Sequence, residues 1–251
     1  MPSATKVQQR YVPSLVADGW ATLDYAARPI FMRARSKQER LMRTTACAKE
    51  PWTTAWILGM RPYVDVFHDI GACVGSYALL AASRGVATVA YEPVPANYAA
   101  MVENCTANAL GSTLTPLCMA IGPRTGIAPL SLASFNPGSA GHGFGVFGAA
   151  GAVATVCVPC YRLDDLLIVM DLPRPSHLLI DVDGAELAVL MGATDTLKRW
   201  VRSVMIEVKR QPELEAGVTA LLGECGFTER ERYEERAGKK IDGVYYALWE
   251  R

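Results

Sequence analysis

Short apolar runs alternate with longer amphipathic segments from residue 64 to the C-terminus. The short runs predict buried strands, and the longer segments predict helices between them. Five strands are expected, at Val64–Asp69, Ala87–Tyr91, Thr113–Met119, His177–Asp181 and Val201–Val208. Phe227–Tyr233 and Val244–Trp249 are expected to close the fold as an antiparallel hairpin. The pattern therefore predicts an α/β fold with a doubly wound, mostly parallel seven-stranded sheet covered on both faces.

Helices are expected in the segments between these strands. Pro95 at the start of one segment and Asn-Ala-Leu-Gly at its end are typical of helix boundaries. The predicted helices are Gly75–Ser83, Pro95–Asn108, Leu163–Val169, Ala185–Arg199 and Pro212–Cys225.

The first sixty residues do not show this alternation of strand and helix patterns. Gln8–Leu23 is predicted to be partly helical, Arg33–Arg43 a basic helix with a solvated face, and Thr53–Met60 a short helix. We therefore predict an N-terminal helical extension or cap over residues 1–60, followed by one domain over residues 61–251.

One long segment, residues 134–152, is crowded with glycine and other small residues. A loop of this length inside a compact domain is usually functional or disordered. We predict that it is a mobile lid over the carboxyl ends of the strands, where open α/β sheets bind ligands.

Composition narrows the class of protein. The chain has 251 residues, of which 51% are hydrophobic, and no formal net charge. A large core is therefore expected, and neither nucleic acid nor a membrane is expected as a partner. Seven cysteines without framework spacing, and an N-terminus without the apolar core of a signal peptide, favour a cytoplasmic protein. Cys157 and Cys160 lie in a strand-like run, where residues three apart face opposite sides, so both are predicted to be structural.

The turn after the first predicted strand carries candidate chemistry. Asp69 ends the strand, and Gly71 and Gly75 follow before a helix. The glycines are expected to let the backbone approach a ligand closely. A dinucleotide fold favours Gly-x-Gly-x-x-Gly, whereas the spacing here is Gly-x-x-x-Gly. Glu92 ends the second strand, where it is placed to accept hydrogen bonds from a ribose, so the pair of features favours S-adenosylmethionine over a pyrophosphate ligand.

Five stretches then occur in an order that resembles the FkbM-type methyltransferase family: residues 69–79, 90–98, 163–167, 180–190 and 206–208. The resemblance extends from about Lys49 to the C-terminus, and Lys49–Thr53 and Gly138–His142 are similar to one branch of the family. It implies a Rossmann-like class I methyltransferase fold and an enzyme that uses S-adenosylmethionine, in a family known largely for O-methylation.

The resemblance also implies roles for individual residues. Asp69, Gly71 and Gly75 would surround the methionine tail, Glu92 would hold the ribose with support from Asn97, and Met119 and Ala120 would lie by the adenine. The full cofactor-binding set is Asp69, Gly71, Ala72, Gly75, Ser76, Glu92, Pro93, Asn97, Met119, Ala120 and Asp181.

The chain departs from the family pattern at three positions. Cys73 stands where relatives commonly carry Asn, and Leu179 where they commonly carry Lys. Asp183 corresponds to Glu in several members. The absence of the lysine removes a cation from the rim of the expected active site.

A hydroxyl acceptor must lose its proton before or during methyl transfer. The resemblance implies that Asp181 and Asp183 face the transferred methyl group, and with Glu207 and His142 they are the candidate catalytic residues. The three carboxylates could instead hold a magnesium ion, although no metal ligand is assigned. Glu186 is interpreted as an acid that stabilises the start of its helix.

The sequence therefore favours an S-adenosylmethionine-dependent O-methyltransferase that acts on a small molecule such as a sugar or another natural product. Two alternatives stay open: a nicotinamide-dependent oxidoreductase, and a non-catalytic S-adenosylmethionine-binding module. A homodimer is the expected assembly only because dimers are common.

Overall fold

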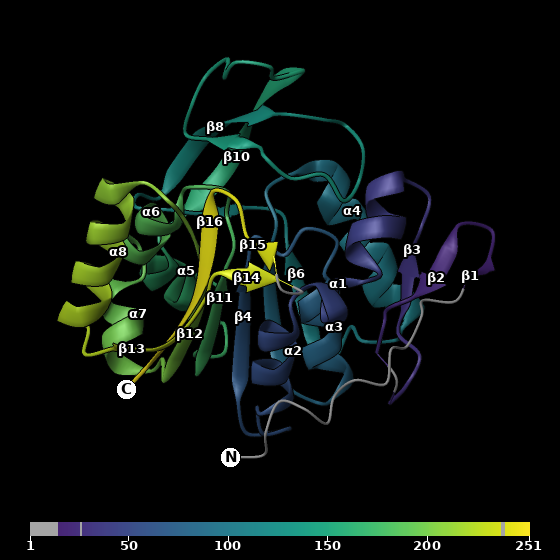
Figure 1. Cartoon of the computed structure of the whole chain (residues 1–251), viewed down its shortest axis with the longest axis horizontal. Coiled ribbons are helices and arrows are strands. Elements are labelled where there is room, and N and C mark those ends of the chain that lie inside the picture. The colour runs from purple at the N-terminus through teal and green to yellow at the C-terminus, as the bar shows by residue number, and fades with distance from the viewer. Residues whose placement is uncertain (1–14, 26, 237–238) are drawn as a thin grey trace.

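A seven-stranded sheet with the order β13-β16-β12-β11-β4-β5-β6 forms the centre of the computed structural model (Figure 1), which describes residues 15–25, 27–236 and 239–251. The parallel strands are β4 (Val66–Ile70), β5 (Ala87–Tyr91), β6 (Leu114–Leu117), β11 (His177–Ile180) and β12 (Ser203–Lys209). β16 (Val244–Glu250) pairs antiparallel with both β12 and β13 (Thr228–Tyr233). The predicted α/β fold and its closing antiparallel pair are confirmed.

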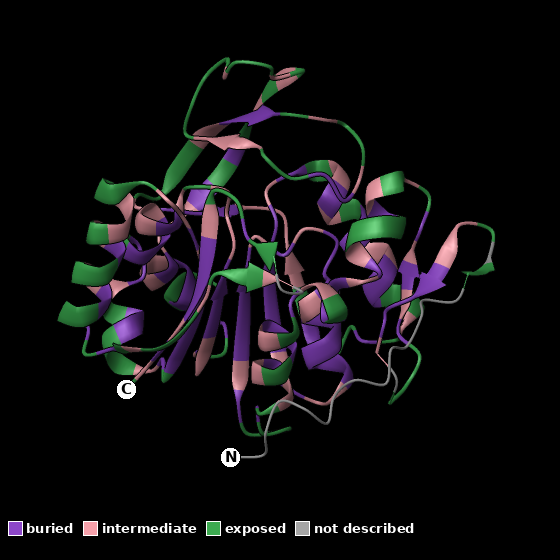
Figure 2. Cartoon of the chain, viewed as in Figure 1, coloured by how far each residue is buried: buried purple, intermediate pink, exposed green. Residues whose placement is uncertain are grey.

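Helices cover both faces of this sheet, and their apolar sides form two core clusters. On one side lie α1 (Ala46–Lys49), α2 (Pro51–Leu58), α3 (Ser76–Ser83) and α4 (Pro95–Ala107). On the other lie α5 (Leu163–Val169), α6 (Glu186–Met191), α7 (Thr194–Arg199) and α8 (Pro212–Glu224). Figure 2 shows the central strands buried and the outer faces of these helices exposed, as expected for a sheet between two helical layers.

The prediction of a single helix over Ala185–Arg199 is wrong. The segment forms two helices, α6 and α7, which are interrupted at Gly192. A Cβ atom on Gly192 would lie 2.0 Å from the carbonyl oxygen of Gly122. The close approach of these two backbone segments therefore requires glycine and interrupts the helix.

The N-terminal segment contains more strand than predicted. Residues 8–14 of the predicted helix Gln8–Leu23 lie outside the described residues, and over the rest the prediction is wrong. β1 (Leu15–Ala17) and β2 (Trp20–Thr22) form a hairpin there, continued by β3 (Phe31–Arg33). The two hairpin residues are Asp18 and Gly19, both with positive φ, and Asp-Gly is a strong sequence signal for such a turn.

The basic stretch Arg33–Arg43 is only partly helical. Arg33 belongs to β3, and the π-helical turn η2 covers Glu39–Arg43. Thr53–Met60 was expected to be a helix and corresponds to α2. The buried side chains of β2–α2 belong to the same core cluster as those of α3, so this segment packs directly on the sheet layer. The boundary between residues 60 and 61 stays a prediction.

A second sheet, not anticipated from the sequence, lies above the carboxyl ends of the central strands (Figure 1). Its strand order is β7-β10-β8-β9, from β7 (Ala120–Ile121), β8 (Gly126–Leu132), β9 (Gly143–Phe144) and β10 (Ala154–Tyr161). We call residues 120–161 the flap. Most of the glycine-rich segment 134–152 connects its strands; the predicted mobility of this segment is untested. On β10, Cys157 is exposed and Cys160 is buried, so the two thiols face opposite sides as predicted.

Among the described residues, no helix is long and apolar enough to cross a membrane.

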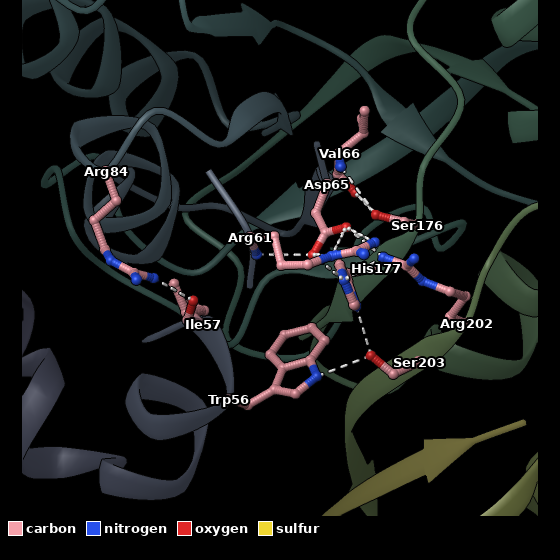
Figure 3. Close-up of polar contacts among 10 residues, drawn as sticks. All are labelled: Trp56, Ile57, Arg61, Asp65, Val66, Arg84, Ser176, His177, Arg202 and Ser203. Atoms are coloured by element: carbon pink, nitrogen blue, oxygen red, sulfur yellow. Dashed lines mark hydrogen bonds and ion pairs between the residues drawn. The ribbon is translucent and has the colours of Figure 1, made fainter. Parts of the chain in front are cut away.

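A polar network ties the amino ends of the central strands together (Figure 3). Asp65, which precedes β4, is buried and pairs with Arg61 at 2.9 Å, with Arg202, and with the Nε2 atom of His177 at 3.3 Å. Burial alone would raise the pKa of Asp65, but the hydrogen bonds from these partners outweigh it and hold the pKa well below its usual value. An acid with a lowered pKa stabilises the fold above its unfolded-state pKa, and this contribution is lost as the pH falls.

Asp65→Asn is expected to lower the free energy of unfolding by about 2–3 kcal/mol at pH 7. The substitution removes the negative charge that pairs with both Arg61 and Arg202. The loss is smaller than for a fully buried pair, since both arginine heads remain partly in water. Urea denaturation measures it. The matched control is Glu103→Gln, which also removes an acid that faces two arginines, Arg33 and Arg35, but one whose own side chain is 43% exposed, and it is expected to cost less than about 0.5 kcal/mol. Equal losses in the two variants would contradict the prediction.

Candidate active site

A cavity of about 210 Å³ opens at the carboxyl ends of β4, β5, β11 and β12, beneath the flap. Leu130 and Phe144 of the flap line it from above. The structure brings ten of the predicted site residues to its wall: Gly71, Glu92, Pro93, Asn97, Met119, Ala120, His142, Asp181, Asp183 and Glu207. Residues from six separate chain segments thus converge where the fold class was expected to bind a ligand.

A smaller cavity of about 30 Å³ adjoins the first, and the two share Arg43, Lys49, Gly71, Cys73 and Asp181. The predicted residues Asp69, Ala72 and Ser76 line this smaller cavity. Gly75 is the one predicted site residue that lines neither of the two. The structure thus brings the predicted residues together around two adjoining cavities, and their assignment as a cofactor or catalytic site stays a prediction.

The glycines of the turn serve the packing of the chain itself. Gly71 has a φ of 89°, and a Cβ atom there would lie 1.9 Å from the carbonyl oxygen of Asp181. A Cβ atom on Gly75 would lie 2.9 Å from Cγ of Met101. The turn after β4 can therefore lie against the end of β11 only with glycine at position 71. The close approach expected toward a ligand is, in this structure, an approach to Asp181.

Glu92 is held rigidly at the end of β5. Its Oε2 atom accepts a hydrogen bond from the backbone N–H of Cys73, and its Oε1 atom accepts one from Val94, both at 2.8 Å. Burial raises the pKa of Glu92 to about 7 in spite of these two bonds. The Asn97 side chain also forms a hydrogen bond with this carboxylate. A carboxylate has about four acceptor sites, so Glu92 can still receive a ribose hydroxyl.

The backbone conformation at Cys73 bears on one departure from the family pattern, the position where relatives commonly carry Asn. Its φ is 53°, a left-handed conformation in which Asn is several-fold enriched over other non-glycine residues. The preference of relatives for Asn at this position therefore has a backbone reason. Burial raises the pKa of the Cys73 thiol to about 12, so it is not an activated nucleophile.

Asp181 and Glu207 form a pair of acids on adjacent strands. The register of β11 with β12 pairs Ile180 with Ile206, which places the two acids side by side. The pKa of Asp181 is raised well above its usual value, first by burial and then by the charge of Glu207. Burial raises the pKa of Glu207 as well. Because the pKa of both acids is raised, the pair retains a proton more readily than two separate carboxylates would, and it can exchange this proton with a ligand.

The side chains of Asp183 and His142 form hydrogen bonds with the backbone in and next to the glycine-rich segment. The Oδ2 atom of Asp183 accepts a hydrogen bond from the backbone N–H of Gly141 at 2.6 Å. The Nδ1 atom of His142 accepts one from Ala133 at 3.2 Å, and its Nε2 atom lies 3.3 Å from the carbonyl oxygen of Ser139. Burial lowers the pKa of His142. Both ring nitrogens are thus occupied by the loop backbone, an arrangement that favours a structural role; its role as a base stays a prediction.

The sequence reasoning missed Glu50, which is buried beside the acid pair. Its carboxylate accepts hydrogen bonds from Tyr77 at 2.7 Å and Tyr246 at 3.1 Å, and pairs with Lys49 at 2.8 Å and with Arg236 at 3.3 Å. The similarity of Lys49–Thr53 to one branch of the family was the available signal, but it did not indicate a chemical role.

The cation absent at position 179 is supplied from another part of the fold. Leu179 is buried and lines the smaller cavity. Lys49, at the end of α1, lines the same cavity, and so does Arg43 at the end of η2. Position 179 itself supplies no cation, as expected, and the N-terminal segment places two cations at the same cavity.

Among the described residues, no group of three or more histidines, cysteines and acids is arranged to hold a metal ion. The magnesium hypothesis thus gains no geometric support from this part of the chain.

Residues 69–229 match the family model described as the methyltransferase FkbM domain. The hexuronic acid methyltransferase AglP of Haloferax volcanii is 27% identical over 162 residues, which cover 64% of this chain and 62% of that protein. The crystal structure of a methyltransferase FkbM from Methylobacillus flagellatus KT aligns with a TM-score of 0.53 and 15% identity, over 77% of this chain and 45% of that one. The matches thus span less than two thirds of these two relatives.

The fold is also similar to P. horikoshii TYW2, a structure in complex with MeSAdo, with a TM-score of 0.50 and 11% identity over 93% of this chain and 70% of that one. At this identity the similarity concerns the fold alone.

Proposed function

The chain belongs to the FkbM methyltransferase family, and from this premise we propose that it transfers the methyl group of S-adenosylmethionine to a hydroxyl oxygen of a small molecule, a sugar hydroxyl first. The name of the Haloferax relative, a hexuronic acid methyltransferase, supports a sugar acceptor. The observation that carries the proposal is that one cavity is lined both by Glu92 and by the acid pair Asp181 and Glu207.

The residues present fit S-adenosylmethionine. The Oδ2 atom of Asp69 is buried and has no hydrogen-bond partner among the described residues, so it is free to receive an ammonium group at the smaller cavity. Glu92 would hold the ribose, and Met119 and Ala120 would line the adenine. When bound, the cofactor supplies a methyl group on a positively charged sulfur, the electrophile of the reaction.

The proposed role of the protein is to align the acceptor, exclude water and accept a proton. With the proton that the pair retains held on Glu207, a carboxylate oxygen of Asp181 would accept the hydroxyl proton of the acceptor, while the bound cofactor would supply the methyl group. Since Glu207 is adjacent, the proton can be shared within the pair and later released to solvent. The raised pKa of Asp181 suits it to accept a proton from a weakly acidic hydroxyl. The flap lies over this cavity and limits the access of water.

Calorimetric titration with S-adenosylhomocysteine tests the cofactor assignment. The wild-type protein is expected to bind it, and Glu92→Ala to weaken the affinity by at least about tenfold, because the ribose hydroxyls lose a charged acceptor. Glu103→Ala, which removes an acid from the exposed side of α4, is the matched control and is expected to leave the affinity unchanged. A wild-type protein that does not bind, or a Glu92→Ala protein with unchanged affinity, would overturn the proposal.

A further inference from the structure

An acid, Asp69, and a cation, Arg43, both line the smaller cavity, and each has polar atoms without a partner among the described residues. The Asp69 carboxylate has a backbone hydrogen bond with Ala78. The carboxylate of Asp69, only 2% exposed, has its Oδ2 atom without a hydrogen-bond partner among the described residues. Arg43 lines the same cavity, and its Nε atom donates to the carbonyl oxygen of Gly138 at 2.9 Å. In the described part of the chain its two terminal nitrogens have no hydrogen-bond acceptor.

Arg43 is held in this position by its surroundings. Its carbonyl oxygen accepts a hydrogen bond from Oγ of Ser76 at 3.0 Å, at the start of α3. At the other end of the same helical turn, the buried carboxylate of Glu39 accepts hydrogen bonds from the backbone N–H groups of Arg35 and Ser36. The turn η2 is thus docked on α3, and the guanidinium group is directed to the cavities rather than to bulk solvent.

Lys49 is less suited to bind an added anion, although it lines the same cavity. Its Nζ atom is already 2.8 Å from Oε1 of Glu50. Arg43 has no such carboxylate within ion-pair distance among the described residues. Its planar guanidinium can donate two parallel hydrogen bonds to one carboxylate, which an ammonium group cannot.

We propose that Arg43 and Asp69 together bind the zwitterionic amino-acid end of S-adenosylmethionine, the carboxylate on Arg43 and the ammonium on Asp69. This inference rests on the proposed function. Arg43 lies outside residues 69–229, the part of the chain that matches the family model, so the N-terminal segment completes the cofactor site. Because the Nε atom of Arg43 also binds Gly138, the same residue links the cofactor to the glycine-rich segment.

The test compares two ligands that differ in this end of the molecule. S-adenosylhomocysteine carries the amino acid, whereas 5′-methylthioadenosine keeps the adenine, the ribose and the sulfur but lacks it. By calorimetry, Arg43→Gln is expected to weaken binding of S-adenosylhomocysteine about 10–100-fold and to change binding of 5′-methylthioadenosine by less than about twofold. Retained binding of the second ligand also shows that the variant folds.

Lys37→Gln is the matched control, because it removes a positive charge from an exposed side chain just before η2. It is expected to change neither affinity. An Arg43→Gln protein that loses affinity for both ligands equally, or for neither, overturns the role of Arg43 while the cofactor assignment stands. A wild-type protein that binds neither ligand overturns the proposed function itself. Arg43→Lys, which keeps the charge without the paired donors, is expected to fall between wild type and Arg43→Gln.

Discussion

Asp181→Asn is expected to lower kcat for methyl transfer about 10²–10⁴-fold, the range typical for loss of a general base. Asparagine has nearly the same shape but cannot accept the hydroxyl proton. Asp181 is not the residue proposed to hold the ribose or the ammonium group, and asparagine keeps its size and its ability to form hydrogen bonds. The affinity for S-adenosylhomocysteine is therefore expected to stay within about threefold. Mass-spectrometric detection of the methylated product, with a glucuronoside as acceptor, measures the rate.

Glu186→Gln is the matched control for this variant. Glu186 is also a buried acid just beyond β11, but it lines neither cavity, and its Oε1 atom accepts a hydrogen bond from the backbone N–H of Gly184. Glutamine can keep that bond, so kcat is expected to change less than about threefold. An Asp181→Asn enzyme with a nearly wild-type kcat would show that the proton leaves by another group, and Glu207→Gln would then be the variant to measure.

The affinity for S-adenosylhomocysteine is expected to fall about 100-fold between pH 8 and pH 6. Burial raises the pKa of both Asp69 and Glu92 to about 7. Both acids must be ionised to receive the ammonium and the ribose hydroxyls. The ionised forms dominate above pH 7. As the pH falls below 7, protons compete with the ligand for both acids, and each acid lowers the affinity by at most about tenfold per pH unit. Calorimetric titrations across this range give the slope directly.

Two comparisons separate the contributions of the two acids. 5′-methylthioadenosine has no amino group, so its affinity is expected to depend on Glu92 alone and to fall only about tenfold over the same interval. Asp69→Asn is expected to reduce the pH dependence for S-adenosylhomocysteine to this smaller value. An affinity that is constant from pH 6 to pH 8, or equal slopes for the two ligands, would contradict the assignment.

The central sheet could be predicted from the sequence because its signals are local. Each parallel strand from Val66–Ile70 to Ser203–Lys209 contains a short apolar run, and all of them except Leu114–Leu117 are followed directly by a helix. Neighbouring parallel strands end at one edge of a sheet, so Glu92, Asp181 and Glu207 could be assigned to one site before any coordinates were known.

The flap and the N-terminal strands were not predicted, for two different reasons. The flap depends on pairing β8 with β10 across the glycine-rich segment, and such non-local pairing leaves a weak signal in a sequence rich in small residues. The hairpin β1–β2 did have a local signal, Asp18-Gly19, but its strands of three residues are too short to show an alternating pattern.

The sequence by itself determined the fold class and the edge of the sheet where the cavity lies, since these follow from periodicity and from strand ends, and the family resemblance indicated ten of the residues that line this cavity. Only the tertiary structure decided which polar and charged groups lie within hydrogen-bond or ion-pair distance of one another. Arg43 reaches Gly138 and Tyr246 reaches Glu50 across long separations in the chain. Side chains so far apart leave no shared local pattern, and whether an acid such as Asp69 is paired or free depends on the packing of the whole chain around it.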